Sequence, residues 1–506
     1  MSALDDKATH VEHIAHAMTN STSGDSTSSL SIDHQQYLIN RYGTLDLEPV
    51  PDPSDEDPLN WPTHKKVINL ILVAFHGLMA TFISSAIIPA YSEIAKDLGI
   101  SLETAAYLTS LQIAILGAAP FFWKPISNRY GRRPVFMLSL FCSTVCNVGC
   151  GLSPDYASMA ACRALVAFFI SPAMAIGSGV VTEMFFKQSR ARAVGLWTLF
   201  YTLGVPLAPF LFGFAAQRIN YRWVYYILAI TNAIQLVLYT FLGPETLYIR
   251  NKSDVSHISQ RKRKCLPIRR IDPTPFTVHE LFHPLSYFFS GPVFIASAAY
   301  AMCFLFGSVL PSVEIPQLFE ARFGFNTEQL GLQFIGLIIG AILGEQIGGQ
   351  ASDTWMKQKS RKIGQRVHPE YRLWLSYVGN AITICGVAVF LVQLDKTPKF
   401  HYNVTPIVGA AFASGGNQIV TTVLVTYAID NSPGDASSVG VFVTFVRQTW
   451  AFIGPFWLPA MFSGLGLRGS AALTCCLIVA VSIIPVVGLH FVKTRGLKRS
   501  TSTGEA

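Results

Sequence analysis

Long apolar stretches alternate with short polar segments along most of the chain. The apolar blocks are about 20 residues long and lie near 67–91, 103–123, 134–152, 157–181, 192–215 and 222–243, and again near 291–313, 328–349, 371–394, 404–429, 436–460 and 468–492. A helix of about 20 apolar residues crosses the roughly 30 Å hydrocarbon core of a bilayer. The pattern therefore predicts an all-α membrane protein whose twelve transmembrane helices form two six-helix bundles.

Polar segments divide the chain into five regions. Residues 1–64 are rich in Ser, Thr and acidic residues and end in a run broken by prolines, so we expect a disordered cytosolic tail. The two bundles are expected over 65–243 and 291–492, with a basic linker loop over 244–290 and a short cytosolic tail over 493–506. The linker contains SQRKRKCLPIRR, a run that no lipid-exposed position would tolerate.

Charge changes this picture only by adding an orientation. The chain is 51% hydrophobic and 13% charged, with a net charge of +8. A positive net charge can indicate nucleic-acid binding, but here the basic residues lie between apolar blocks, where cytosolic loops concentrate them. We therefore expect no nucleic-acid partner, and we place both termini and the linker in the cytosol. The expected partners are the lipid bilayer and a small-molecule substrate, and we expect a monomer.

Several function classes are excluded by what the sequence lacks. Eight of the nine cysteines lie inside apolar runs, where we expect free thiols, and no metal site is predicted. The chain has no phosphate-cradling G-x-x-x-x-G-K-S/T motif, so we expect neither an ATPase nor a cofactor, and a proton gradient is the inferred energy source. An embedded enzyme would need His or Asp clustered at one membrane depth, which scattered single residues do not provide.

The turn after the second apolar block carries a recognisable motif. It reads WKPISNRYGRRPVF and contains R-x-G-R-R, formed by Arg129, Gly131, Arg132 and Arg133. This turn resembles the loop between spans two and three of the major facilitator superfamily, whose pattern is G-x-x-x-D-R-x-G-R-R. Lys124 and Asn128 replace the Gly and the Asp. In the family the carboxylate and arginines form a cytosolic latch between the halves, and the resemblance assigns the carboxylate role to Asp353, at the matching place in the second half.

Further motifs refine the resemblance. Arg163 in span four stands at the Arg of the family's R-x-x-x-G pattern, with Ala167 in place of the Gly. Span five is similar to the antiporter pattern G-P-x-x-G-P-x-x-G-G at Gly204, Pro209 and Gly213. The runs DPLNWP, RINYRWVYYI and GPET resemble the fungal, twelve-span drug:proton antiporter branch. The resemblance covers about 60–495 and implies a secondary transporter, and within the family span five is associated with exporters.

Charged side chains inside the apolar blocks are the first candidates for function, because an unpaired Arg at the bilayer centre costs about 2.5 to 3.5 kcal/mol. Arg447 lies near the middle of span eleven and Arg163 about a third of the way into span four. Each needs a partner or a water-filled cavity. For both, a functional role and a structural ion pair or carbonyl contact stay open.

Proton coupling needs a carboxylate or a His that changes charge as the site changes side. Glu345, in the inner third of span eight, is our first choice, because desolvation at that depth raises its affinity for protons. Arg447 is its expected counter-charge if spans eight and eleven approach. His76 fits a ligand and a hydrogen-bonded core residue equally well, and Asp430 fits an interface anchor or helix-end charge better than a coupling group.

Polar and aromatic residues on apolar faces near the midplane are candidates for the substrate pocket, namely Tyr201, Asn417, Gln418, Gln448 and Trp450. A mixed aromatic and amide lining suits amphipathic organic molecules.

The leading hypothesis is an alternating-access secondary transporter that exports a small organic compound, such as a drug, toxin or secondary metabolite, against a proton gradient. Uptake of a nutrient or of an organic cation such as a polyamine is the alternative within transport. A non-transporting sensor on the same fold is the alternative outside it. We favour the plasma membrane as the location, with the vacuolar membrane as the alternative.

Overall fold

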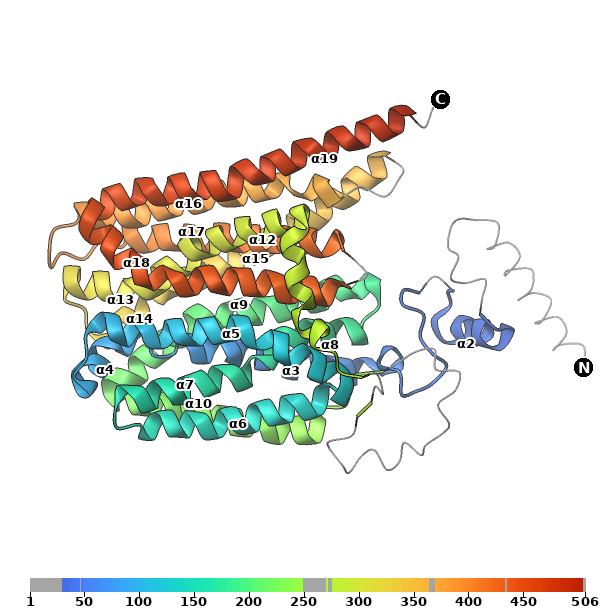
Figure 1. Ribbon diagram of the computed structural model, residues 1–506, viewed down its shortest axis with the longest axis horizontal. Helices are drawn as coiled ribbons and strands as arrows, with labels where there is room; N and C mark the ends of the chain where they lie inside the picture. The colour runs from blue at the N-terminus through green and yellow to red at the C-terminus, as the bar shows by residue number, and fades with distance from the viewer. Residues whose placement is uncertain are drawn as a thin grey trace, which may run out of the picture.

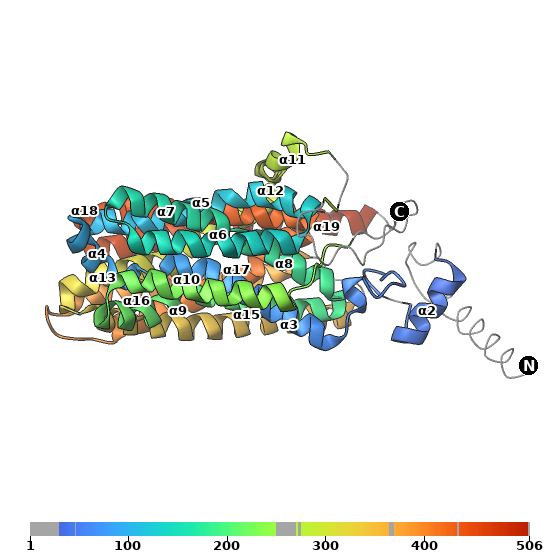
Figure 2. The same cartoon turned by 90° about the horizontal axis from the view of Figure 1, so that it is seen from below.

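The computed structural model describes residues 30–45, 47–248, 270–271, 275–363, 369–432 and 435–503, and it contains helices and no strand within them. Most of the helices run along the long axis of the molecule (Figure 1). One end carries α2 (Ile32–Tyr42) and the C-terminal end of α19 (Ile484–Thr503), and we call this end the terminal face. We call the opposite end, where α4 and α13 lie, the distal face (Figures 1 and 2).

The N-terminal half forms six crossings. They are built by α3 (Thr63–Ser85) with η2 (Ile88–Ala90) and α4 (Tyr91–Leu98), by α5 (Leu102–Tyr130), α6 (Arg132–Leu152), α7 (Tyr156–Ile170) with α8 (Pro172–Met184), α9 (Lys187–Arg218) and α10 (Tyr221–Leu242). The fourth crossing is divided at Pro172, because proline has no backbone N–H to continue the helical ladder.

The C-terminal half begins with a crossing interrupted by a π-turn. This crossing consists of α12 (Gly291–Phe304), the π-turn η5 (Leu305–Val309) and α13 (Leu310–Phe323). It is followed by α14 (Thr327–Leu332) with α15 (Phe334–Ile363), η6 (Pro369–Arg372) with α16 (Trp374–Lys396), α17 (Thr405–Asp430), α18 (Ala436–Ile478), η8 (Val479–Ile483) and α19. Gly307 allows the π-turn to lie against α17, since a Cβ there would come 2.8 Å from Cβ of Asn417.

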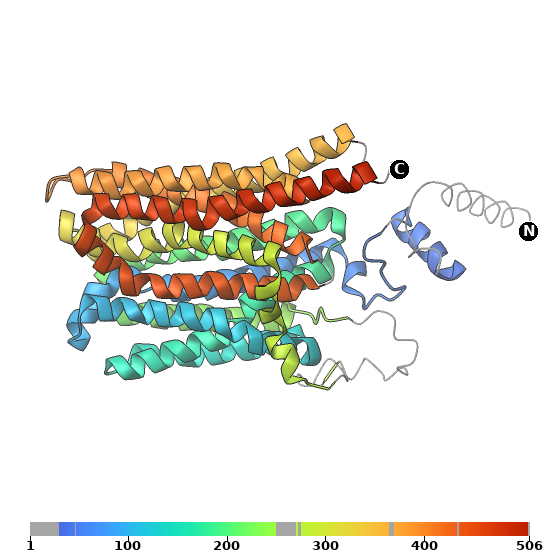
Figure 3. The same cartoon turned by 45° about the horizontal axis from the view of Figure 1, so that its top comes forward.

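Eleven stretches of the described residues are long and apolar enough to cross a membrane, and the last of them, Ala436–Lys493, has 58 residues. This stretch makes two crossings, because Gly466 has φ 68° and ψ 172° inside α18, which no helix accommodates. Figures 1 and 3 show the chain turning back at the distal face before α19 returns to the terminal face. The predicted fold of twelve transmembrane helices is therefore confirmed within the described part of the chain.

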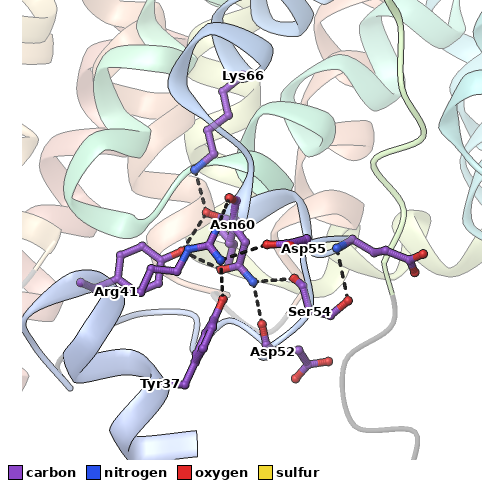
Figure 4. Close-up of polar contacts among 10 residues, drawn as sticks. Tyr37, Arg41, Asp52, Ser54, Asp55, Asn60 and Lys66 are labelled. Atoms are coloured by element: carbon purple, nitrogen blue, oxygen red, sulfur yellow. Dashed lines mark hydrogen bonds and ion pairs between the residues drawn. The ribbon is translucent and has the colours of Figure 1, made fainter.

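Part of the segment that we expected to be disordered is folded. Within the tail expected to be disordered over 1–64, the described residues from 30 onward include α2 and the short helix η1 (Pro58–Asn60). α2 lies at the terminal face (Figure 1), and Figure 4 shows the polar contacts of this segment. The side-chain amide of Asn60 donates to the backbone carbonyls of Asp52 and Ser54, at 2.6 Å each, and the backbone carbonyl of Asn60 accepts from Arg41 at 2.7 Å. Lys66 of α3 donates to the Leu59 carbonyl at 2.8 Å.

This folded segment is attached to the bundle. The backbone N–H of Lys187 donates to the Glu48 carbonyl at 2.9 Å, and the rings of Tyr42 and Phe186 meet edge to face at 5.4 Å. Composition misled here, because the buried side chains of Asp57 and Asn60 in the DPLNWP region hydrogen-bond to the local backbone and to Tyr42 instead of facing water.

The linker, expected as a loop over 244–290, is helical in its described second part. α11 (Val278–Phe282) and η4 (His283–Phe289) precede α12, and α11 projects from one side of the bundle (Figure 2). Pro284 occupies one of the first positions of η4, where its missing N–H has no helical partner to lose. The basic run RKRK lies outside the described residues.

Candidate functional site

A cavity lies between the two halves and encloses about 860 Å³ of empty space, its opening included. Serine, threonine and apolar side chains form most of its wall. The N-terminal half contributes Thr81, Ser84, Thr109, Tyr201 and Thr202, and the C-terminal half contributes Tyr300, Ser308, Ser312, Leu337, Ser414, Asn417, Gln418, Arg447 and Gln448. Both halves therefore contribute to a single site, which is the arrangement that alternating access requires.

Four of the five predicted pocket residues line this cavity: Tyr201, Asn417, Gln418 and Gln448. Trp450 does not. It lies in a second hollow on the C-terminal half, lined by Phe288, Phe294 and Pro485. Trp450 follows Gln448 by two positions, which is a rotation of about 200° around a helix, so the two side chains lie on nearly opposite faces.

Arg447 is the one formally charged side chain among the described residues that line the cavity. It is 5% exposed, donates to the Tyr300 hydroxyl at 3.1 Å and also donates to the Tyr201 hydroxyl on the opposite half. Its guanidinium lies 4.7 Å from the Phe304 ring centroid, and its Nε has no hydrogen-bond partner. A buried cation held by neutral partners retains attraction for an anion.

The expected pairing of Arg447 with Glu345 is wrong. Glu345 of α15 accepts from the Gln418 amide at 2.6 Å and from the Thr422 hydroxyl at 3.2 Å, both on α17 of the same half. Glu345 makes no ion pair with any cation of the described residues. Spans eight and eleven therefore do not bring these two charges together, and the carboxylate is stabilised by neutral donors.

A second buried carboxylate, Glu314 of α13, was missed by the sequence reasoning. It is 1% exposed, and its Oε1 has no hydrogen-bond partner. The apolar block that predicted span seven ended at 313, but the helix continues to Phe323. The signal that would have found it is helical continuity: no Gly or Asn stop follows residue 313 until Gly324, which ends the helix with φ 68°.

Arg163 is fully buried and braces the N-terminal half through neutral acceptors. It donates to the carbonyls of Leu108 and Ser84 at 3.2 Å each, to the Gln112 side chain at 2.7 Å and to the Tyr225 hydroxyl at 3.3 Å. These contacts connect α3, α5, α7 and α10. The geometry corresponds to the carbonyl-contact alternative, and Arg163 does not line the cavity.

The other two coupling candidates lie away from the cavity. His76 is buried inside the N-terminal half, where its Nε2 lies 3.2 Å from the Ser139 hydroxyl and its ring meets Phe136 edge to face. Asp430 is exposed at the last position of α17. Neither is placed to respond to a substrate in the cavity.

The R-x-G-R-R turn is organised around two carboxylates that the motif itself does not contain. Glu245 accepts from the backbone N–H groups of Arg132 at 2.9 Å and Arg133 at 3.0 Å, at the N-terminus of α6. The Arg132 side chain pairs with Glu183 at 2.8 Å and donates to Asn128 at 2.8 Å. Burial raises the pKa of the Glu245 carboxyl, while the backbone N–H groups oppose that shift.

Gly131 is required in this turn. Its φ is 99°, and a Cβ at this position would lie 2.4 Å from Oε2 of Glu245. Arg129 follows a different course: it pairs with Glu280 of α11 at 2.5 Å and donates to the Pro275 carbonyl at 2.8 Å, so it holds the linker to α5. Asp353 lies in α15, and its side chain is outside the described part of the structure.

Lys124, which stands where the family has Gly, joins the two halves at the terminal face. Its Nζ lies 3.9 Å from Asp435, the N-cap residue of α18, and donates to the Ser438 hydroxyl. Nearby, Phe121 meets Phe445 edge to face at 5.2 Å. A cation from the N-terminal half thus contacts an acid at the start of span eleven.

The halves also contact each other at the distal face. Arg218 pairs with Glu328 at 2.9 Å, the Thr327 hydroxyl donates to Glu93 at 2.7 Å, and Ser92 donates to Glu320. These contacts hold the two halves together at the distal face. We call this set, Ser92, Glu93, Arg218, Glu320, Thr327 and Glu328, the distal seam.

The small residues of the span-five motif explain why the two halves approach each other so closely near the distal seam. A Cβ on Gly213 would lie 2.9 Å from Cα of Gly331, and one on Gly331 would lie 2.8 Å from the Pro209 carbonyl oxygen. Gly204 lies against α3, where a Cβ would be 2.1 Å from the Thr81 hydroxyl. The small residues of α9 therefore allow backbone contact across the halves.

Comparison with known proteins agrees with this geometry. Residues 73–455 match the family model of the Major Facilitator Superfamily. The efflux pump vrtL of Penicillium aethiopicum is 27% identical over 84% of this chain and 85% of its own length, and an uncharacterized transporter of Schizosaccharomyces pombe is 26% identical over 87% and 90%. The crystal structure of a bacterial homologue of the human lysosomal transporter Spinster, inward-facing and unoccupied, aligns with a TM-score of 0.58 at 15% identity, over 86% of this chain and 99% of that one. The chain belongs to the Major Facilitator Superfamily; it is a multi-pass membrane transporter and not an enzyme.

Proposed function

We propose that this member of the Major Facilitator Superfamily is a proton-coupled exporter of small organic compounds that carry a carboxylate or another anionic group. The observation that carries the proposal is Arg447, the one formal charge of the described cavity lining, held by tyrosine hydroxyls from both halves. Its apolar and hydroxyl-rich surroundings suit an amphipathic molecule.

The charge of the cavity argues against the polyamine alternative. A cationic group about 6 Å from the guanidinium would be repelled by about 3 kcal/mol at an effective dielectric constant of about 20. Among the described lining residues no carboxylate offsets this repulsion.

The orientation follows from the distribution of basic residues. The end of α5 and the starts of α6 and α9 lie at the terminal face and contain Lys124, Arg129, Arg132, Arg133 and Lys187. We therefore propose that the terminal face is on the cytosolic side and that the distal face opens to the exterior. The favoured membrane is the plasma membrane. Export is supported by efflux pumps among the relatives, at about a quarter identity.

A vesicle assay tests direction and coupling together. Deleting the gene and comparing small molecules inside and outside the cells identifies the compound that accumulates. Purified protein in liposomes is then given an imposed pH gradient, with the compound on the side of higher pH. The expected result is movement of the compound toward the acidic side, abolished by a protonophore. Movement of the compound in the same direction as the protons, or movement that does not depend on the pH gradient, would refute antiport.

A further inference from the structure

Glu314 is a fully buried carboxylate of the described spans, and its Oε1 has no hydrogen-bond partner. It lies on α13, nine residues before the distal end of the helix at Phe323. Its neighbours Ser312 and Val313 line the central cavity, and α13 packs against η2 of the opposite half. Glu314 is therefore buried close to the boundary between the halves, on the distal side of the cavity.

The charged groups around Glu314 do not compensate an ionised carboxylate. Tyr91 and the exposed Glu103 of the N-terminal half lie within electrostatic range of Glu314, whereas Arg163 acts on Tyr91 and not on Glu314. The Tyr91 hydroxyl donates to Thr109 at 2.8 Å instead.

The elements packed against α13 provide no counter-charge either. The π-turn η5 contains no titratable residue, and Glu328 of α14 pairs with Arg218. On α18, Arg447 donates to the tyrosines and Arg468 pairs with Asp395. Within the described residues, Glu314 has no ion-pair partner.

We propose that Glu314 is the proton-binding site that controls the distal seam. While the seam is closed, a carboxylate with 1% exposure and an unpartnered oxygen is stable only with its proton bound. When the halves separate at the distal face, water reaches Glu314 and hydrates the carboxylate, so the free-energy cost of ionising it falls. Proton binding to Glu314 from the exterior therefore closes the distal seam, and the deprotonated, ionised form of Glu314 favours the distally open state.

This assignment distinguishes Glu314 from Glu345. Glu345 accepts two hydrogen bonds from its own half, and these donors remain in place when the halves separate. Its protonation is thus independent of the distal seam. Glu314 instead lies against the opposite half and loses that contact on opening.

The experiment measures opening without any substrate. Spin labels are placed at Ile219→Cys and His401→Cys, exposed positions on the distal loops of the two halves, in a background with the native cysteines replaced. Distance distributions are recorded by double electron–electron resonance in lipid nanodiscs between pH 5 and pH 9. In the parent protein, the ratio of closed to open molecules is expected to rise as pH falls, by up to about tenfold per pH unit for one linked proton.

Glu314→Gln, which mimics the protonated form, is expected to stay closed across this pH range, whereas Glu314→Asp keeps a titrating response. The matched control Glu345→Gln is expected to keep the parent response. A Glu314→Gln protein that titrates like the parent, or a Glu345→Gln protein that has lost the response, would overturn the proposal.

The inference rests on the proposed function only in assuming that the halves separate at the distal face. Because the distances are read without substrate, a chain that fails to export can still show the Glu314-dependent closure. Conversely, a chain that exports can show pH-dependent closure that does not change when Glu314 is replaced. Failure of the inference and failure of the proposed function are therefore separate results.

Discussion

The charge preference of the cavity is tested most directly by Arg447→Gln. This change removes the one formal charge of the described lining but keeps a polar side chain that can still donate to Tyr201 or Tyr300. A hydrogen bond to a charged group contributes about 1.5 to 3 kcal/mol. Loss of that contribution corresponds to about 10- to 150-fold weaker binding of a carboxylate ligand.

The assay compares three compounds of the same shape. Binding of 2-naphthoate, its neutral amide and 2-naphthylmethylamine to purified protein is measured by titration calorimetry. The parent protein is expected to bind the carboxylate best and the amine worst. Arg447→Gln should lose affinity for the carboxylate alone. Arg447→Lys keeps the charge but not the planar guanidinium, so its affinity for the carboxylate should lie between those of the parent protein and Arg447→Gln.

Arg468→Gln serves as the control, because Arg468 pairs with Asp395 at 2.6 Å at the distal face, outside the cavity. Thermal unfolding of each variant separates lost binding from lost folding. Equal affinity of the parent protein for the carboxylate and the amide, or an equal loss for both in Arg447→Gln, would refute the reasoning.

Three further predictions concern stability and gating. Glu245→Ala should destabilise the start of α6 by about 0.5 to 2 kcal/mol and lower the Tm, since two helix N–H groups lose their acceptor, whereas the exposed Glu56→Ala should leave the Tm unchanged. Gly213→Ala should destabilise the distally closed state by about 1 to 3 kcal/mol and raise the open fraction, while Gly195→Ala on the same helix, which has open space, should not. Lys124→Ala removes the contact with Asp435 that joins the halves at the terminal face. In a Gly440→Cys background, this variant should raise the rate of thiol labelling by up to about tenfold, equivalent to about 1.4 kcal/mol. Labelling at the parent rate would show that the contact is not a latch.

Sequence periodicity identified the fold because the bilayer imposes one length on every span. All twelve predicted blocks correspond to helices of the described chain, and the errors lie at the ends of the blocks. The end of the seventh block was the costly error, because hydropathy dropped at Glu314 although the helix continued to Phe323. A hydropathy window penalises a charged residue even where protein, and not lipid, surrounds it.

The same limit explains the tail and the latch. Composition indicated disorder for residues 1–64, but in the described part of this segment Asn60 and Asp57 direct their polar groups inward to the local backbone. The R-x-G-R-R motif was recognised from its residues, yet its carboxylate partners are Glu183 at the end of span four and Glu245 in the segment after span six. No local pattern contains such long-range partners.

The sequence by itself determined the number of spans, the basic terminal-face loops and four of the polar residues that line the cavity, because these depend on local composition and helical spacing. Only the tertiary structure decided which charges meet. It separated Arg447 from Glu345, directed Trp450 to another surface and left Glu314 without a partner between the halves. Pairing of charges depends on which helix faces approach each other, and that is settled by side-chain packing between distant segments of the chain.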